Sequence, residues 1–226
     1  MSKVSRLTAL SAVLASFGAL LVPVRYAAAQ SADFISSFSI LGGPAVTCTS
    51  STTTGDLGVA TTAAFTNTGC TVNGTVHAGD AAAASAYTNF LAAYDAIRAL
   101  ACTSSLTGTL AGQTLAPGVY CVSAVAKTGV LTLNGPSTAT WTLKFMDGAG
   151  TGAFTGTNFS VVLTGGALPC NVTYWSEAAS TLTDSQLKGN IYSGAGLTLT
   201  RGSFVGRAMG KAGVTLTGVT SLSGCS

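Results

Sequence analysis

The acidic side chains are the residues of this chain with the most obvious catalytic potential. Asp147, Glu177 and Asp184 are the acids that follow Asp95, and none of them forms a recognisable pair. Cleavage of a polysaccharide needs paired carboxylates or a cluster of acid, base and cation. Asp184 follows a Thr-Leu-Thr segment, where a turn-capping Asp is the simpler interpretation. The sequence therefore predicts a protein that is not an enzyme.

The single histidine, His77, lies three residues before Asp80 and allows two interpretations. The two residues could form a general-base dyad, but no nucleophile or partner acid accompanies them. They could instead cap a helix and fasten it to the strands before it, and the sequence favours this structural role. Asp56, in Thr-Gly-Asp-Leu-Gly, is most simply a turn residue that accepts hydrogen bonds from backbone amides.

Three aromatic residues, Trp141, Tyr174 and Trp175, could form a platform for a carbohydrate. Their strand context and alternation favour a place in the core or at an interface between elements. The sequence thus leaves glycan binding open as an alternative function, with an extracellular adhesion module as its most natural form.

Six cysteines are present, and none of them forms a CxxC pair or lies near His77 in the sequence. This pattern argues against a zinc site, and we expect no metal and no cofactor. An even number in an exported chain predicts three disulfides, although six cysteines allow 15 connectivities. We favour pairing of neighbours, which joins Cys48 to Cys70, Cys102 to Cys121, and Cys170 to the C-terminal Cys225.

A repeat of 17 residues runs through the last part of the chain. Thr-Leu-Thr recurs at 181–183, 198–200 and 215–217, and Gly189-Asn190 is followed 17 residues later by Gly206-Arg207. A short fixed period with β-branched residues predicts a β-solenoid with one repeat per coil. Alternate strand residues point to opposite faces, so Leu182, Leu199 and Leu216 should point inward. The flanking threonines should form two outward columns, consisting of Thr181, Thr198 and Thr215 and of Thr183, Thr200 and Thr217.

The first 29 residues have the features of a secretory signal. Lys3 and Arg6 precede an apolar run that ends near Pro23 and Arg25, and small residues lead to Gln30. Three of the ten basic residues lie in this segment, so seven basic and seven acidic residues remain. A near-neutral domain lacks the clustered basic face that nucleic-acid binding requires. We therefore expect a secreted, monomeric domain at 30–226 that binds neither nucleic acid nor, after cleavage of 1–29, a membrane.

One segment differs from the strand-rich remainder of the chain. Residues 80–100 are rich in Ala, free of Gly and Pro, and carry apolar side chains at helical spacing. They predict one long helix at about 79–100, with Asp80 at its start. Its contacts should come from Tyr87, Phe90, Leu91, Tyr94 and Ile97. Strands are expected at 118–122, 129–133, 140–145 and 159–163, and no linker divides the domain.

Seven short motifs together resemble the secreted ice-binding protein family. They are FSILGG at 38–43, TGDLGV at 54–59, GTVHAGD at 74–80, LAPGVY at 115–120, CNVTYW at 170–175, LKGNI at 187–191 and GRA at 206–208. The resemblance implies a mainly β fold, a discontinuous right-handed β-helix with triangular coils and one α-helix packed alongside. It also implies that a flat β-face rich in Thr adsorbs to ice and inhibits ice growth and recrystallisation. Arg201, directly after Thr200, departs from an ideal face of this kind.

Overall fold

The structure, a computed structural model, describes residues 37–61 and 64–225. The expected signal peptide at 1–29 lies outside these residues, as do the first residues of the domain expected at 30–226.

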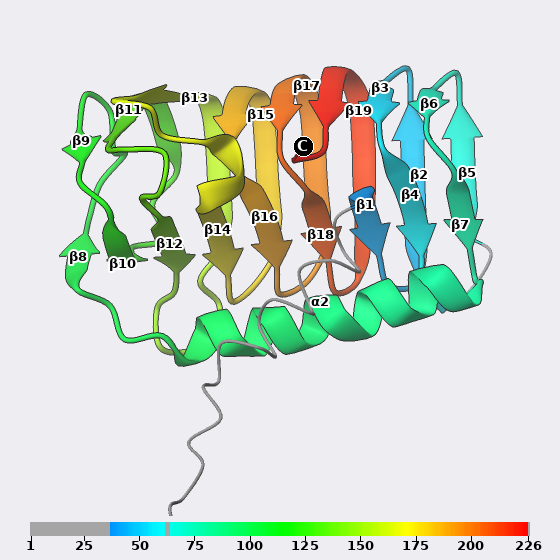
Figure 1. The fold of residues 1–226 in the computed structure, drawn as a ribbon, viewed down its shortest axis with the longest axis horizontal. Coiled ribbons are helices and arrows are strands. Elements are labelled where there is room, and N and C mark those ends of the chain that lie inside the picture. Colours follow the sequence, from blue (N-terminus) through cyan, green and yellow to red (C-terminus); the bar gives the residue numbers. More distant parts are fainter. Residues whose placement is uncertain (1–36, 62–63, 226) are drawn as a thin grey trace, which may run out of the picture.

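Parallel strands form two sheets around a common core (Figure 1). The first sheet contains, in spatial order, β7 (Val76–Ala78), β4 (Asp56–Val59), β1 (Phe38–Gly42), β18 (Ala208–Gly210), β16 (Asn190–Ser193), β14 (Val172–Ser176), β12 (Trp141–Phe145), β10 (Gly118–Val122) and β8 (Ser104–Leu106). The second sheet contains β5 (Phe65–Thr68), β2 (Ala45–Thr49), β19 (Gly213–Ser223), β17 (Leu197–Val205), β15 (Ser180–Lys188), β13 (Phe154–Thr164), β11 (Lys127–Asn134) and β9 (Thr114–Leu115). Strand β3 (Thr52–Thr54) pairs on one side with the end of β19 and on the other side with β6 (Thr71–Asn73). A short 3₁₀ helix (Pro169–Asn171) precedes β14.

The long strands of the second sheet each bend at a residue in the left-handed backbone region. The bends lie at Asn158 in β13, Asp184 in β15, Arg201 in β17 and Gly218 in β19, with φ between 51° and 62°. Each complete coil therefore has three flat sides. We call the first sheet the helix face, and the strand halves before the bends, with β2 and β5, the threonine face. The halves after the bends, with β3 and β6, form the third face.

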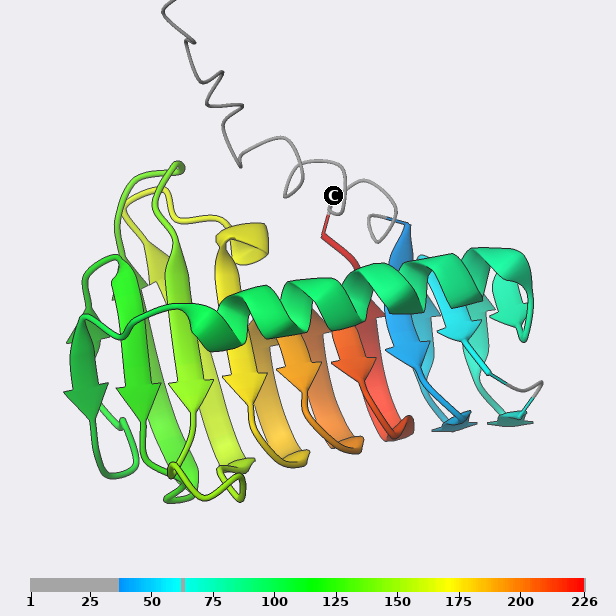
Figure 2. The same cartoon turned by 90° about the horizontal axis from the view of Figure 1, so that it is seen from below.

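The stacking order of the coils is discontinuous along the chain. Strand β1 pairs with β18, so the N-terminal coils stack on the C-terminal one and continue the solenoid beyond it. Helix α2 (Ala81–Ala99) then carries the chain from the β7 end to the β8 end, along the helix face (Figure 2). This is the discontinuous β-helix with one long flanking helix that the sequence motifs implied.

Helix α2 begins and packs as the sequence predicted. The Asp80 carboxylate caps it by accepting a hydrogen bond from the Ala83 N–H. A cluster of apolar side chains joins the helix to the sheet, with Tyr94 against Trp175 and Phe90 against Tyr192 at ring separations of 5.0 and 5.7 Å. Tyr87, Leu91 and Ile97 pack at the margin of this cluster, so all five expected side chains contribute.

The core of the solenoid is apolar and continuous from β5 to β9. The strands expected at 118–122, 129–133 and 140–145 are present, the first with the bounds predicted. The strand expected at 159–163 instead begins at Phe154, five residues earlier. The first half of the strand was not predicted because it contains Gly156 and Asn158, which are both poor strand formers. The strand bends at Asn158.

Candidate functional site

The threonine face carries two straight columns of threonine. The cross-strand register places Thr155, Thr181, Thr198 and Thr215 on neighbouring strands at one position. The column continues through β2 and β5. One column consists of Thr66, Thr47, Thr215, Thr198, Thr181 and Thr155, and the other of Thr68, Thr49, Thr217, Thr200, Thr183 and Thr157. The face is thus a regular array of twelve threonines over six coils.

In five of the six strands, a buried residue between the two columns holds the threonines outward; in β5, at the end of the array, this position is the exposed Asn67. Leu182, Leu199, Leu216 and Cys48 stack in register at the inward position, and each is fully buried. In β13 this position is Gly156, where an added Cβ would come within 2.8 Å of Leu182 Cδ2. Since adjacent strand residues alternate in direction, burial of the central residue points both flanking threonines to the outside.

The hydroxyl groups of these twelve threonines are not used inside the protein. In the described residues, none of their Oγ1 atoms takes part in a hydrogen bond with another protein group. Threonines elsewhere in the fold do use theirs, as when Thr103 donates to the Val119 carbonyl and Thr220 to the Gly202 carbonyl. The columns therefore present both donors and acceptors, together with methyl groups, to whatever lies against the face.

Sequence reasoning found half of this array. The repeat of 17 residues identified the triplets in β15, β17 and β19, but those at 47–49, 66–68 and 155–157 are spaced differently. A search for Thr-x-Thr alone, without a fixed period, would have found all six triplets. The N-terminal pair of triplets was also hidden because α2 separates them in sequence from the coils on which they stack.

Arg201 does not interrupt the face, because it lies at the bend between the threonine face and the third face. Its φ of 52° turns the chain immediately after Thr200. Its guanidinium donates two hydrogen bonds to the Asp184 carboxylate at the corresponding bend of the next coil, of 2.6 and 2.7 Å. This pairing lowers the pKa of Asp184, whose role at a turn agrees with the structural interpretation of its sequence context.

Three disulfides fasten the solenoid. They join Cys48 to Cys70, Cys102 to Cys121 and Cys170 to Cys225, which are the pairs favoured from the sequence. The first ties β2 to the outermost coil at one end, and the last ties the C-terminus to the 3₁₀ helix before β14.

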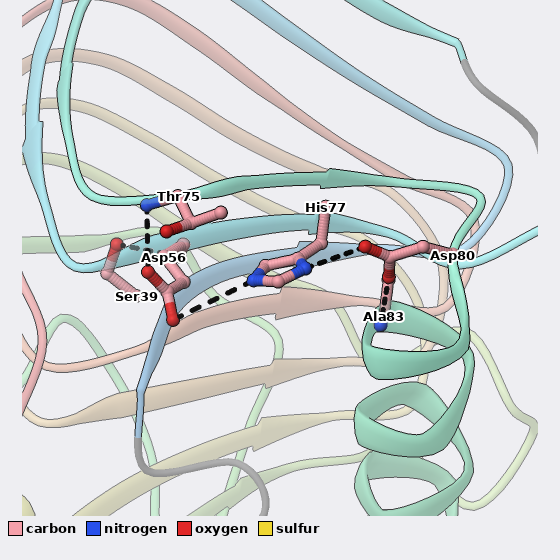
Figure 3. Close-up of polar contacts among 6 residues, drawn as sticks. All are labelled: Ser39, Asp56, Thr75, His77, Asp80 and Ala83. Atoms are coloured by element: carbon pink, nitrogen blue, oxygen red, sulfur yellow. Dashed lines mark hydrogen bonds and ion pairs between the residues drawn. The ribbon is translucent and has the colours of Figure 1, made fainter.

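The residues around His77 form a structural network between strand and helix (Figure 3). His77 Nδ1 lies 2.7 Å from Asp80 Oδ2, and its Nε2 lies 4.0 Å from Asp56 Oδ2. Asp56 accepts a hydrogen bond from the Thr75 N–H, as expected of a turn residue. The hydrogen bond from Ala83 and then the His77 side chain lower the pKa of Asp80. Both carboxylates are thus occupied with backbone amides, which supports the capping role over a general-base dyad.

The aromatic side chains considered as a carbohydrate platform are buried. Trp141 and Tyr174 are fully enclosed in the solenoid, and Trp175 is enclosed beneath α2. Across the described residues, no three His, Cys, Asp or Glu side chains are grouped so that they could hold a metal ion. Among those residues there is also no helix long and apolar enough to cross a membrane. The threonine face is therefore the strongest candidate for a functional surface.

The fold and this face define a rigid β-solenoid that presents one residue type in a regular array. The chain belongs to the ice-binding-like family, whose model matches residues 40–221. Membership of this non-enzymatic family agrees with the expectation that the chain is not an enzyme.

Individual relatives support the same assignment. An ice-binding protein of Nostoc sp. (strain HG1) is 35% identical over 198 residues, which cover 84% of this chain and 72% of that protein. The crystal structure of an ice-binding protein from the Antarctic ascomycete Antarctomyces psychrotrophicus superposes with a TM-score of 0.76 at 28% identity, over 84% of this chain and 95% of that one. An ice-binding protein from an Antarctic biological consortium matches with a TM-score of 0.73 at 26% identity, over 98% and 96% of the two chains.

Proposed function

We propose that this protein is exported, acts as a monomer and adsorbs to ice through the twelve threonines of its threonine face. The observation that carries the proposal is the array itself, with two columns in register and with hydroxyls that bond to no other group in the described chain. Three disulfides support export, because such bridges persist in oxidising compartments.

The dimensions of the face suit a crystalline surface. Residues i and i+2 of a strand lie about 6.7 Å apart, and neighbouring strands lie about 4.8 Å apart. Both repeats are of the order of the oxygen spacings in ice. A six-coil array in strict register can therefore meet many lattice positions at once.

Methyl and hydroxyl groups have complementary roles in this proposal. The methyl groups favour the loss of bulk water from the face, and the hydroxyls hold an ordered layer through hydrogen bonds. Each contact is weak. Because the solenoid is already rigid, little conformational entropy is lost on adsorption, and the contacts together can give a substantial binding free energy. Adsorbed molecules would force ice to grow as curved fronts between them, which lowers the local freezing point and slows recrystallisation.

The central threonines provide the direct test. Thr198→Tyr and Thr200→Tyr each place a bulky ring on the flat array, and we expect thermal hysteresis and recrystallisation inhibition to fall steeply. Because both side chains point outward, the stability should change by less than about 1 kcal/mol. Gln186→Tyr is the matched control, since Gln186 is exposed on the third face of β15. Full activity in both threonine variants would contradict the proposal and make the columns a purely structural feature.

A glycan-binding screen of the same purified protein tests the alternative function. Ice-crystal shaping without a glycan hit supports the proposal. A glycan hit without shaping would replace it with an extracellular adhesion or glycan-binding module.

A further inference from the structure

The border between the threonine face and the third face carries two charges of opposite sign. Six stacked residues in the left-handed region form this border, one after each Thr-x-Thr triplet, and they are Gly69, Ser50, Gly218, Arg201, Asp184 and Asn158. Four of them are uncharged. Asp184 and Arg201 lie in neighbouring coils, between the register pairs Thr183–Thr200 and Ser185–Gly202. The charges therefore stand beside the middle of the second threonine column.

The geometry of the pair restrains the arginine. Nε and one terminal nitrogen of Arg201 bond separately to the two oxygens of Asp184, at 2.6 and 2.7 Å. On the opposite side lies Gly218, where a Cβ would be in ordinary van der Waals contact with Arg201 Cγ, at 3.4 Å. A bidentate contact fixes the plane of the guanidinium as well as its position.

An unrestrained arginine at this place would interfere with ordered water. Arginine has a long flexible side chain and carries its charge at all relevant pH values. A guanidinium released from Asp184 can reach over Thr200, and its own hydration competes with an ice-like layer. The short Asp184 side chain lacks this reach.

Charges at the other border of the threonine face are restrained in a similar way. Lys211 lies with its Nζ 3.6 Å from the centre of the Tyr94 ring, toward α2, and 3.9 Å from Asp95. The Glu177 carboxylate accepts a hydrogen bond from the Asp147 N–H. At both borders, then, charged side chains are held by partners outside the threonine columns.

We propose that Asp184 is a positioning residue for ice adsorption, which holds the Arg201 guanidinium at the bend and so keeps the threonine face clear. This inference rests on the proposed function. Because exposed ion pairs contribute little to stability, the role of Asp184 lies in the arrangement of the surface.

Three variants at the bend test the inference. Asp184→Asn removes the negative charge and one of the two acceptor oxygens, so the bidentate hold on Arg201 is lost. Arg201→Asn removes the guanidinium, and the double variant makes both positions neutral. Asn suits all of them, because it tolerates the left-handed region and already occupies the equivalent bend at Asn158. Thermal hysteresis and melting temperature are measured for each at equal concentration, beside wild type and Thr200→Tyr.

We expect Asp184→Asn to reduce thermal hysteresis by about twofold or more, since the freed guanidinium disturbs the hydrogen-bonded layer. Arg201→Asn and the double variant should keep wild-type hysteresis, and all melting temperatures should stay close to wild type. Full hysteresis in Asp184→Asn overturns the inference. The inference is also overturned if the double variant does not recover the hysteresis lost in Asp184→Asn, or if the loss is accompanied by a lowered melting temperature. In either case the ion pair has a structural role only. A wild-type protein without hysteresis refutes the proposed function itself, which is a separate result.

Discussion

The Nζ of Lys144 donates a hydrogen bond of 2.6 Å to the carbonyl oxygen of Leu100, the residue that caps the C-terminal end of α2. A second bond of 2.8 Å reaches the Arg98 carbonyl oxygen. Lys144 comes from β12 in the helix face and is almost entirely buried. Together with the contact of His77 with Asp80 at the other end, it fastens α2 at both termini to the solenoid. The helix can therefore brace the full row of coils that carries the threonine face.

Lys144→Met should destabilise the protein without altering the threonine face. Met retains much of the apolar stem but leaves two helix-end carbonyl oxygens without their donor, which costs about 1–3 kcal/mol. Urea unfolding measures the loss, and thermal hysteresis per folded molecule should be unchanged. Lys188→Met is the control, because Lys188 is half-buried on the third face and its Nζ bonds to no described residue. Equal stability of the two variants would refute the role of Lys144.

Lys127 gives a specific prediction for alkaline pH. Its side chain is buried, its Nζ donates to the carbonyl oxygens of Gly108 and Ser123, and burial lowers its pKa to about 8. The unfolded chain keeps this proton until about pH 10.4, so it binds more protons than the folded chain between these values. The free energy of unfolding should then rise with pH across that window, by at most about 1.4 kcal/mol per pH unit for one proton.

The contribution of Lys127 is isolated by comparison with Lys127→Met. The difference in unfolding free energy between wild type and this variant is measured at several pH values from 7 to 10. It should shift in favour of wild type as the pH rises. A difference that does not depend on pH would mean that the buried amine keeps an ordinary pKa.

The sequence was sufficient to predict those parts of the fold that follow from local periodicity. Helix α2, its cap at Asp80 and its five contact residues follow from composition and helical spacing. The inward leucines and outward threonines of β15, β17 and β19 follow from strand alternation within a constant repeat. In these segments each residue's environment depends mainly on its near neighbours in sequence.

Features that depend on contacts between distant segments were not predictable in this way. Strands β2, β5 and β13 double the expected threonine array. The pairing of β2 with β19 joins residues about 170 positions apart in sequence, such as Val46 and Val214. Buried lysines are likewise unexpected, because Lys is normally exposed, and Lys127 and Lys144 are accommodated by carbonyl oxygens supplied by other segments. From the sequence, Arg201 was expected to interrupt the face, because its left-handed backbone conformation at the bend is not evident from the sequence.

All six cysteines should be oxidised, as the three bridges of the structure require. Thiol titration of the denatured, unreduced protein should detect almost no free thiol, since each of the six cysteines lies in one of three bridges. Replacing Cys48 and Cys70 together by Ala should cost about 2–4 kcal/mol of stability, because the bridge restricts the unfolded chain. Two or more reactive thiols per chain would contradict the three-bridge structure and weaken the case for export.

Leu199→Ala separates the stability of the solenoid from the chemistry of its surface. Leu199 lies fully buried between Thr198 and Thr200, stacked on Leu182 and Leu216, so truncation opens a cavity in the column of leucines. The loss should be about 2–5 kcal/mol, against less than about 1.5 kcal/mol for the volume-conserving Leu199→Met. Thermal melting measures both. Ice assays are performed near 0 °C, where the variant should still be folded, so its thermal hysteresis should remain close to wild type while that of Thr198→Tyr is lost. If Leu199→Ala loses hysteresis while circular dichroism shows it folded at the assay temperature, the leucine column itself must set the flatness of the threonine face.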